Sequence, residues 1–224
     1  SKHNDTFSKK KTSELVKGDK LPVNIVSKKH FGNLGTYSDG FLCGWIYGDG
    51  WIIRQKNSGE TQVNFTIYEK DGIQGGIKSI IEEKLREIGV HTSLHFREIE
   101  ETYGWYEFSS KDKKLEEFLS KFGCDNKKNG LPSKIWNDVT KEFTYGFLDG
   151  LLSSGATIEK DKRITLTTAP ENLVKDIVDL LGSLGIVSNV YKQISRLKGY
   201  DKTYSFYNIS FQGHYIEDKF TLSN

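Results

Sequence analysis

The chain has 224 residues, of which 36% are hydrophobic and 22 are glycine, so its composition lies in the range of ordinary globular proteins. Lysine and arginine number 32 and aspartate and glutamate 30, and this balance excludes a polybasic tail or coat as the means of binding nucleic acid. Any such surface must therefore come from local segregation of charge. The longest apolar run, from Phe41 to Tyr47, is interrupted by Gly44 and is far shorter than the roughly 20 residues that cross a bilayer.

The start of the chain and its cysteines indicate a compartment. The chain begins at Ser1 with neither an initiator methionine nor an apolar signal core, so we expect an excised or internal piece of a protein that is not secreted. Cys43 and Cys124 are too few for a disulfide scaffold or a metal cluster. We therefore expect an intracellular, reducing location, cytoplasmic or nuclear.

The first half of the chain predicts helices and strands in a regular order. Apolar and polar residues alternate from Val63 to Tyr68, which is the period of a half-buried strand. Apolar residues recur on one helical face from Ile77 to Ile88, and Gly89 follows as a stop signal. In chain order we expect an apolar helix at 41–50, strands at 51–55 and 63–68, a helix at 77–88, strands at 91–98 and 105–109, and a helix at 115–122.

The second half repeats this order. It predicts an apolar helix at 147–156, a strand at 163–167, a helix at 173–184 that ends at Gly185, and strands at 189–195 and 204–211. The sequence of helix, two strands, helix, two strands and helix is therefore expected twice. Strands joined in hairpins, with helices gathered on one side, predict an α+β fold of antiparallel sheets whose other face is open.

The two apolar segments carry a motif. Residues 42–50, Leu-Cys-Gly-Trp-Ile-Tyr-Gly-Asp-Gly, resemble the signature of LAGLIDADG homing endonucleases at positions one, three, five, eight and nine. Residues 148–156 match it at positions one, three and four and lack the acid at position eight. Because this second copy lies 106 residues later and is followed by the same order of elements, the resemblance extends over residues 38–215. It implies the LAGLIDADG homing-endonuclease fold, a pseudo-twofold αββαββα repeat whose two antiparallel sheets form a DNA-binding saddle.

Small residues four apart in each motif predict close packing of two helices. Gly44 and Gly48 share one face of the first helix, and Gly150 and Ser154 share one face of the second. Helices without bulky side chains on one face can approach closely. The resemblance implies that these two helices pack at the pseudo-twofold axis.

The resemblance also implies a metal-dependent nuclease site at the ends of the two helices. Asp49, at the eighth motif position, would hold the ion, because Mg²⁺ prefers carboxylate and carbonyl oxygens and activates water for phosphodiester hydrolysis. Ca²⁺ or Mn²⁺ would be substitutes. A simple turn residue at the helix end is the alternative for Asp49. The second motif has Gly155 at the equivalent place, which offers the metal only a backbone carbonyl, so nicking or loss of activity are alternatives to cleavage of both strands.

Supporting catalytic residues are expected near the ends of strands. Glu69 after the second strand and Lys111 after the fourth are candidates for positioning water and stabilising phosphate charge, as the resemblance implies. Their expected counterparts in the second half, Thr168 and Gln212, make the first half the more complete site. A solvated helix start is the alternative for Lys111. Asp149, at the second motif position, is expected on the wrong helical face to replace the missing acid.

Polar side chains opposite the apolar stripe of each sheet are candidates for DNA recognition, because a β-ribbon fits the major groove. An ordinary solvated sheet face has the same pattern, and the pair of motifs favours recognition. His91 and His95 lack the further ligands that zinc would need. The candidates are Arg54, Lys56, Asn64, Thr66, Tyr68, His91, His95, Arg97, Arg163, Thr165, Thr167, Gln193, Arg196, Lys198 and Asn208.

The two ends of the chain resemble parts of inteins. Residues 14–19, Glu-Leu-Val-Lys-Gly-Asp, resemble the end of an N-terminal splicing segment, and residues 220–224 resemble the strand before an intein's terminal His-Asn. Plain surface strands are the alternative. We therefore divide the chain into a flank at 1–35, a first LAGLIDADG subdomain at 36–135, a second at 136–215 and a C-terminal flank at 216–224.

These features predict a monomeric, pseudo-symmetric endonuclease of intein type. It would recognise a long asymmetric site in double-stranded DNA and cut it with Mg²⁺, with a host splicing domain as a partner in the parent chain and no membrane partner. The alternative is a non-cleaving nucleic-acid-binding protein on the same scaffold, either an RNA-intron maturase or a DNA-binding regulator. The missing second acid favours that alternative, whereas Asp49 and Lys111 argue against it. We do not expect splicing by this chain, since the nucleophilic first residue and the terminal His-Asn are not in the sequence.

Overall fold

The computed structural model describes residues 12–14, 16, 29–55, 59–68, 76–91, 95–99, 103–125, 130–196 and 203–212. After a short 3-10 helix at Thr12–Glu14, the first half consists of α1 (Tyr37–Gly48), β1 (Trp51–Arg54), β2 (Thr61–Tyr68), α3 (Ile77–Ile88), β3 (His95–Ile99), β4 (Tyr103–Ser110), α4 (Lys113–Phe122) and α5 (Ser133–Asn137). The second half consists of α6 (Lys141–Gly155), β5 (Ala156–Ile158), β6 (Arg163–Thr168), α7 (Glu171–Ser183), β7 (Ser188–Arg196) and β8 (Thr203–Gln212).

The predicted α+β fold class is confirmed. Each half forms a four-stranded antiparallel sheet, with strand orders β1-β2-β4-β3 and β5-β6-β8-β7. The repeated order of elements holds as far as β8, and the helix expected to close the second repeat falls outside the described residues. The short helix α5 was not predicted from the sequence. It begins directly after Pro132, whose fixed φ suits the start of a helix.

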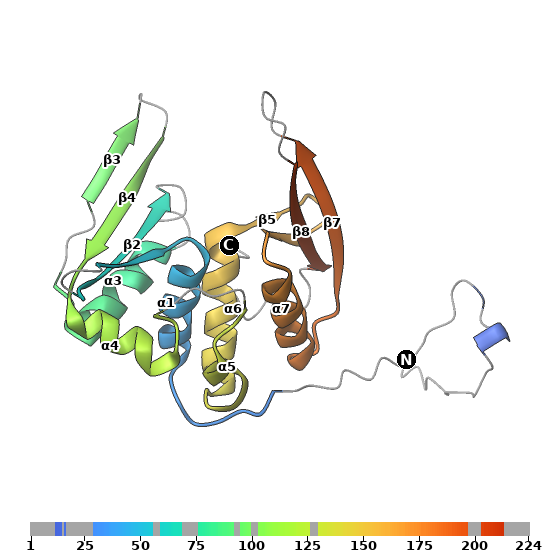
Figure 1. The fold of residues 1–224 in the computed structure, drawn as a ribbon, viewed down its shortest axis with the longest axis horizontal. Helices are drawn as coiled ribbons and strands as arrows, with labels where there is room; N and C mark the ends of the chain where they lie inside the picture. Colours follow the sequence, from blue (N-terminus) through green and yellow to red (C-terminus); the bar gives the residue numbers. More distant parts are fainter. Residues whose placement is uncertain are drawn as a thin grey trace, which may run out of the picture.

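Helices α1 and α6 lie side by side between the two sheets (Figure 1). A Cβ atom on Gly44 would overlap the backbone carbonyl of Phe147, and one on Gly150 would overlap that of Phe41. The two helix backbones therefore touch at these glycines, and any side chain would force them apart.

The contact between the helices continues along their whole length. A Cβ atom on Gly48 would overlap the Ser154 hydroxyl, so the four small residues singled out in the motifs all lie at this contact. Two further glycines, Gly40 and Gly146, also pack on the partner's backbone and extend the contact toward the helix starts. Along α1, Gly40, Gly44 and Gly48 meet residues of increasing number on α6, namely Phe143, Phe147 and Ser154. The two helices therefore run parallel, and their C-terminal ends lie at the same end of the molecule.

The chain segments that lead into the two helices fix their starts. The N–H of Gly32 donates to the carbonyl of Val139 (2.9 Å), and the N–H of Thr140 donates to the carbonyl of Leu34 (3.0 Å). Thr36 then caps α1 in a reciprocal arrangement with Asp39, and Thr140 caps α6. Because the two entry segments pair with each other, both helices begin at the same level.

Each sheet is apolar on the side that faces helices. Val63, Phe65 and Ile67 of β2 are fully buried there, and the Phe65 ring stacks on Phe108 of β4 at a centroid distance of 4.3 Å. In the second half Ile164, Leu166 and Ile209 play the same part. No helix of the described residues covers the opposite face of either sheet (Figure 1). None of the helices in the described ranges combines the length and apolar character of a membrane span.

Candidate nucleic-acid interface and active site

Asp49 lies at the C-terminal end of α1 and is half-buried. Its backbone N–H caps the helix, and its carboxylate accepts a hydrogen bond from the Thr66 hydroxyl at 2.6 Å. The next residue is Gly50, where a Cβ atom would lie 2.6 Å from the Ile46 carbonyl oxygen, so only glycine allows the chain to turn into β1. The local sequence thus places a carboxylate between the end of α1 and the middle of β2.

Gly155 occupies the equivalent place at the end of α6 and is exposed. A Cβ atom there would meet only Leu166 Cδ1, at 3.8 Å, and Gly155 is not among the glycines with a left-handed φ. The site therefore has room for a side chain. The hydroxyl of Thr167, the counterpart of Thr66, donates to Asn208 Oδ1 at 2.8 Å. The second half thus retains the threonine but has no carboxylate for it at this helix end.

Asp149 does not replace the missing acid. Its side chain is fully buried within the α1–α6 contact, where it accepts hydrogen bonds from the Tyr37 hydroxyl and from the Ser153 hydroxyl, the latter at 3.2 Å. It lies almost two helical turns before Gly155, so it serves the packing of the helices.

Lys111, one of the candidate catalytic residues, is not brought to Asp49. The Asp49 carboxylate contacts Thr66, whose partner on β4 is Glu107, and Lys111 lies four residues beyond Glu107, a separation of roughly 13 Å along the strand. Its ammonium group pairs with Glu60 at 3.1 Å and half of its side chain is exposed. Glu69 lies outside the described residues.

The strand register also corrects one expected counterpart. Thr168 pairs with Tyr207 in the second sheet at the place where Ile67 pairs with Tyr106 in the first. Thr168 therefore corresponds to Ile67 and lies on the side of the sheet that faces the helices. It is therefore not the counterpart of Glu69. Ser110 and Phe211 occupy equivalent positions in the two sheets, and Lys111 and Gln212 follow them directly. Gln212 is therefore the counterpart of Lys111, as expected.

Cross-strand pairing identifies the side chains on the open faces, because directly paired residues of an antiparallel sheet project from the same face. In the first sheet Thr66, Glu107 and His95 form one such row, and Tyr68, Trp105 and Arg97 form the next. Of the candidates for DNA recognition, the open faces carry Asn64, Thr66, Tyr68, His95, Arg97, Arg163, Thr165, Thr167, Gln193 and Asn208.

Two arginines among the candidates lie on the other face. Arg54 pairs with Thr61, whose hydroxyl contacts Glu116 of α4, and its guanidinium forms an ion pair with Asp125 at 2.7 Å. Arg196 pairs with Thr203, in the same phase as the residues of β7 that face α7. The expected placement of both arginines on the open face was wrong, because each is one residue out of phase with it.

One of the remaining candidates, His91, lies off the sheets. His91 is an exposed loop residue after α3, so the strand expected from that position is wrong at its start. Lys56 and Lys198 lie outside the described residues.

The arginines on the open faces are already paired with acids. Arg97 contacts Glu107 at 3.1 Å, and Arg163 contacts Asp161 at 2.7 Å. The hydrogen bond from the Arg163 guanidinium holds the pKa of the Asp161 carboxyl below its usual value. DNA phosphates would have to compete with these carboxylates for the guanidinium groups.

Several residues of the open face of the first sheet were missed by the sequence interpretation, among them Trp51, Ile53 and Glu107. Trp51 and Ile53 project there because they pair with Asn64 and Gln62, and Glu107 because it pairs with Thr66. The alternation of Trp105, Glu107 and Ser109 with two apolar residues was a signal that could have identified Glu107.

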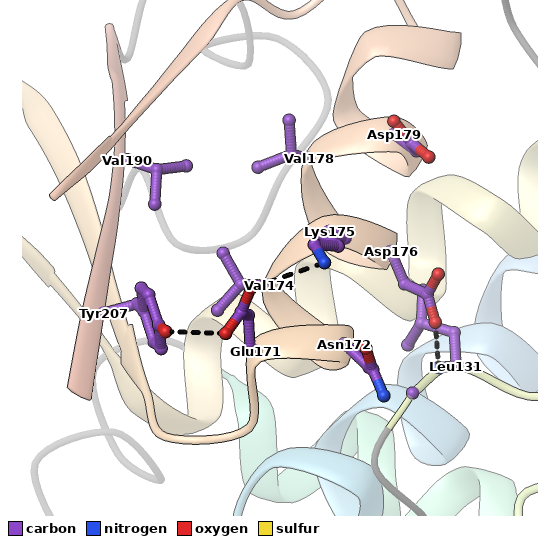
Figure 2. Close-up of a pocket in the computed structure, with 11 residues that line it drawn as sticks. Leu131, Glu171, Asn172, Val174, Lys175, Asp176, Val178, Asp179, Val190 and Tyr207 are labelled. Atoms are coloured by element: carbon purple, nitrogen blue, oxygen red, sulfur yellow. Dashed lines mark hydrogen bonds and ion pairs between the residues drawn. The ribbon is translucent and has the colours of Figure 1, made fainter. Parts of the chain in front are cut away.

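A hollow of about 890 Å³ lies elsewhere, between α7, the strands β7 and β8, and the loop at Gly130 (Figure 2). Its polar groups mostly bind one another: the Tyr207 hydroxyl donates to Glu171 at 3.1 Å, and Asp176 accepts the N–H of Leu131 at 2.7 Å. Tyr207 and Val190 belong to the helix-facing side of the sheet, so this hollow is separate from the open face and from Asp49.

Residues 142–217 match the family model described as the LAGLIDADG-like domain. A solved structure of a variant of the homing endonuclease I-DmoI, with its target DNA nicked in the coding strand and in the presence of Mn, is similar to the chain at 18% identity and a TM-score of 0.58, over 84% of this chain and 96% of that one. A second I-DmoI variant, with its target DNA and Mg, is similar at 16% identity and a TM-score of 0.58, over 84% of this chain and 97% of that one.

The homing endonuclease I-WcaI, bound to its DNA recognition sequence, is similar at 16% identity and a TM-score of 0.52, over 86% of this chain and 84% of that one. Such likenesses establish the fold. The chain has the LAGLIDADG homing-endonuclease fold, and its second half contains a LAGLIDADG-like domain.

Proposed function

We propose that the chain binds a specific site in double-stranded DNA across its two open sheet faces and hydrolyses one phosphodiester bond there with a divalent metal ion. The observation that carries this proposal is the single carboxylate of Asp49, held by Thr66 at the end of one of two parallel central helices. The structural relatives, which are homing endonucleases with DNA and Mn or Mg, support the same function.

The residues at the helix ends suit a hard divalent ion held jointly with DNA. Among the described residues no three histidine, cysteine, aspartate or glutamate side chains gather as a metal site. Mg²⁺ usually keeps several waters and binds through one or two carboxylates together with phosphate oxygens, so Asp49 with a DNA phosphate is a sufficient donor set. The Gly155 carbonyl would be the further donor from the second half. When bound, the ion would polarise the phosphate and lower the pKa of a water nucleophile.

The protein's own part is to fix the position of the acid. Thr66 donates to one oxygen of the Asp49 carboxylate and so orients the group that would hold the ion. Because Gly155 supplies no carboxylate, we propose that the first half is the competent site and that the chain nicks one strand. Hydrolysis there adds water across a phosphorus–oxygen bond and leaves the complementary strand intact.

The finer features of this function are also proposals. Mg²⁺ is the ion that the oxygen donor set favours. The different side chains of the two open faces support a long asymmetric site bound by a monomer. The intein type and a host splicing domain rest on the ends of the chain alone. Cys43 and Cys124, both buried free thiols, support an intracellular, reducing location, cytoplasmic or nuclear.

The test begins with selection of duplexes from a random pool in Ca²⁺, followed by incubation of the selected duplex, labelled on each strand in turn, with Mg²⁺. We expect cleavage of one labelled strand, and a loss of about 100-fold or more in its rate for Asp49→Asn, with binding retained. Asp125→Asn, which removes an acid on the helix-facing side, is the matched control and should cleave as the wild type does. Equal cleavage by Asp49→Asn would refute the site.

A non-cleaving nucleic-acid-binding protein, an RNA-intron maturase or a DNA-binding regulator, is the second candidate. The arginines on the open faces are neutralised by Glu107 and Asp161, and one of the two motif acids is missing. Tight binding to a structured intron RNA, with no cleavage of any selected duplex in Mg²⁺ or Mn²⁺, would favour the maturase. Tight binding to a selected duplex without cleavage would favour the regulator.

A further inference from the structure

The open faces of the two sheets differ in chemistry at equivalent positions. Trp51 follows Asp49 by two residues and Thr157 follows Gly155 by two, and they pair with Asn64 and Thr165 respectively. This register makes Thr157 the counterpart of Trp51. By the same register Glu159 is the counterpart of Ile53.

The first open face carries exposed apolar and aromatic side chains beside polar ones such as His95 and Arg97. Trp51 is 43% exposed, Ile53 is 46% exposed and Tyr68 is 52% exposed. Trp105 lies beside Tyr68 as its cross-strand partner. These side chains lie on both sides of the row that contains Thr66.

The amides on this first face are used within the sheet. Gln62 donates from its side-chain nitrogen to Asn64 Oδ1 at 3.0 Å and to the Ser109 hydroxyl at 2.8 Å. Asn64 is only 5% exposed. Its amide is therefore poorly placed to contact a base edge, although it lies on the open face.

At the positions of Trp51 and Ile53, the second open face has Thr157 and Glu159, and both are exposed. Gln193 and Tyr191 are exposed on β7, and Asn208 pairs with Tyr191 and accepts a hydrogen bond from Thr167. Amide and hydroxyl groups of this kind suit hydrogen bonding to base edges.

The position of the apolar side chains relative to Asp49 indicates what covers them. Trp51 is two residues from Asp49, and Thr66, which holds the Asp49 carboxylate, lies on the same face between Asn64 and Tyr68. Any duplex that brings a phosphate to Asp49 must therefore lie over Trp51 and Tyr68. In the major groove the apolar feature of a base pair is the thymine C5-methyl group.

We propose that the two sheets read their half-sites by different chemistry: the first sheet recognises thymine methyl groups through Trp51, Ile53 and Tyr68, and the second recognises base edges by hydrogen bonds. This inference rests on the proposed binding of duplex DNA. It predicts that the bound DNA has thymines at defined positions in the half-site that the first sheet contacts, next to Asp49.

Replacement of thymine by uracil tests the inference, because it removes the methyl group and leaves every hydrogen-bonding group in place. The probe is the duplex selected by the wild-type chain from a random pool in Ca²⁺, with uracil placed in one half-site at a time. We expect about three- to fivefold weaker binding for each contacted thymine in the first half-site, as one buried methyl group contributes. Uracil in the second half-site should leave affinity unchanged.

Variants assign the effect to the sheet. Ile53→Ser should bind the thymine-containing duplex several-fold more weakly. At the one position that Ile53 contacts, this variant should bind thymine and uracil equally well. Val190→Ser is the matched control, since Val190 is 42% exposed but lies on the helix-facing side of β7. It should discriminate as the wild type does.

The possible results separate this inference from the proposed function. If no duplex is enriched, the proposed DNA binding itself is wrong. If a duplex is enriched and either lacks thymine in the first half-site or binds equally well with uracil there, DNA binding stands and the methyl-recognition inference is overturned.

Discussion

The C-terminal ends of α1 and α6 lie at equivalent places, yet Asp49 stands at one and Gly155 at the other. The helices that carry them are almost interchangeable in their packing, because small residues occupy the contact on both sides. The space at Gly155 would admit a side chain, so the missing acid is not a requirement of the fold. Symmetry is therefore maintained where the backbones touch, whereas the chemistry at the helix ends is free to differ.

The largest expected effect contrasts the helix contact with the helix end. Gly44→Ala places a methyl group against the Phe147 carbonyl, so it should destabilise the protein by about 3 kcal/mol or more. Gly155→Ala should change stability by less than about 0.5 kcal/mol. Thermal unfolding of both variants measures this, and equal stabilities would mean that the helices do not meet as described.

A buried ion pair distinguishes the first half from the second. Lys84 Nζ contacts Asp39 at 2.6 Å, and both side chains are nearly buried. Burial alone would raise the pKa of Asp39, but hydrogen bonds from Lys84 and Thr36 hold it below its usual value. The second half has Tyr145 and Leu180 at the corresponding positions.

Lys84→Met should therefore lower the free energy of unfolding by about 3 kcal/mol at pH 7. Because the folded pKa of Asp39 is depressed, its contribution to stability is present above the unfolded value, near about 4, and disappears as pH falls through the folded value. The difference between wild type and variant should shrink accordingly in denaturation curves below that pH. Lys175→Met, which breaks an exposed pair with Glu171, should cost at most about 0.5 kcal/mol, and a cost as large as that of Lys84→Met would contradict the comparison.

Thr66 and Thr167 provide a comparison of the two sites themselves. Thr66→Val removes the hydroxyl that orients Asp49, so kcat for nicking should fall about tenfold with little change in DNA affinity, and Thr66→Ser should restore it. Thr167→Val breaks only the contact with Asn208 and should leave kcat unchanged. Single-turnover rates and binding curves separate these effects. A loss of affinity alone in Thr66→Val would show that Thr66 contacts DNA rather than positioning the acid.

The sequence predicted what depends on local spacing. The fold class and the small residues of the helix contact follow from periodicity within single segments. The orientation of Arg54 and Arg196 did not, because a shift of one residue in strand register moves every side chain to the other face. The place of Lys111 required knowing which end of β4 lies near Asp49. The pairing of Arg54 with Asp125 joins residues far apart in the chain and leaves no local signal.

The smallest expected effect concerns salt. Arg54 faces the helices and Arg97 and Arg163 are paired with acids, so the described candidates offer few phosphate contacts. We therefore expect the slope of log affinity against log salt to be no steeper than roughly −4. Arg97→Gln should reduce the slope by at most about one, and Arg54→Gln should not change it. A fluorescence anisotropy titration at several salt concentrations measures the slopes, and a steeper slope that depends on Arg54 would contradict the assigned faces.

The most direct test of the account is Gly155→Asp, compared with the wild type on a supercoiled plasmid that carries the selected site. The second helix end lacks a carboxylate and has room for one, so the wild type should give mainly nicked circles and the variant should give linear DNA. Gel electrophoresis separates the two products. Linear product from the wild type at the same rate as from the variant would contradict the claim that Gly155 confines cleavage to one strand.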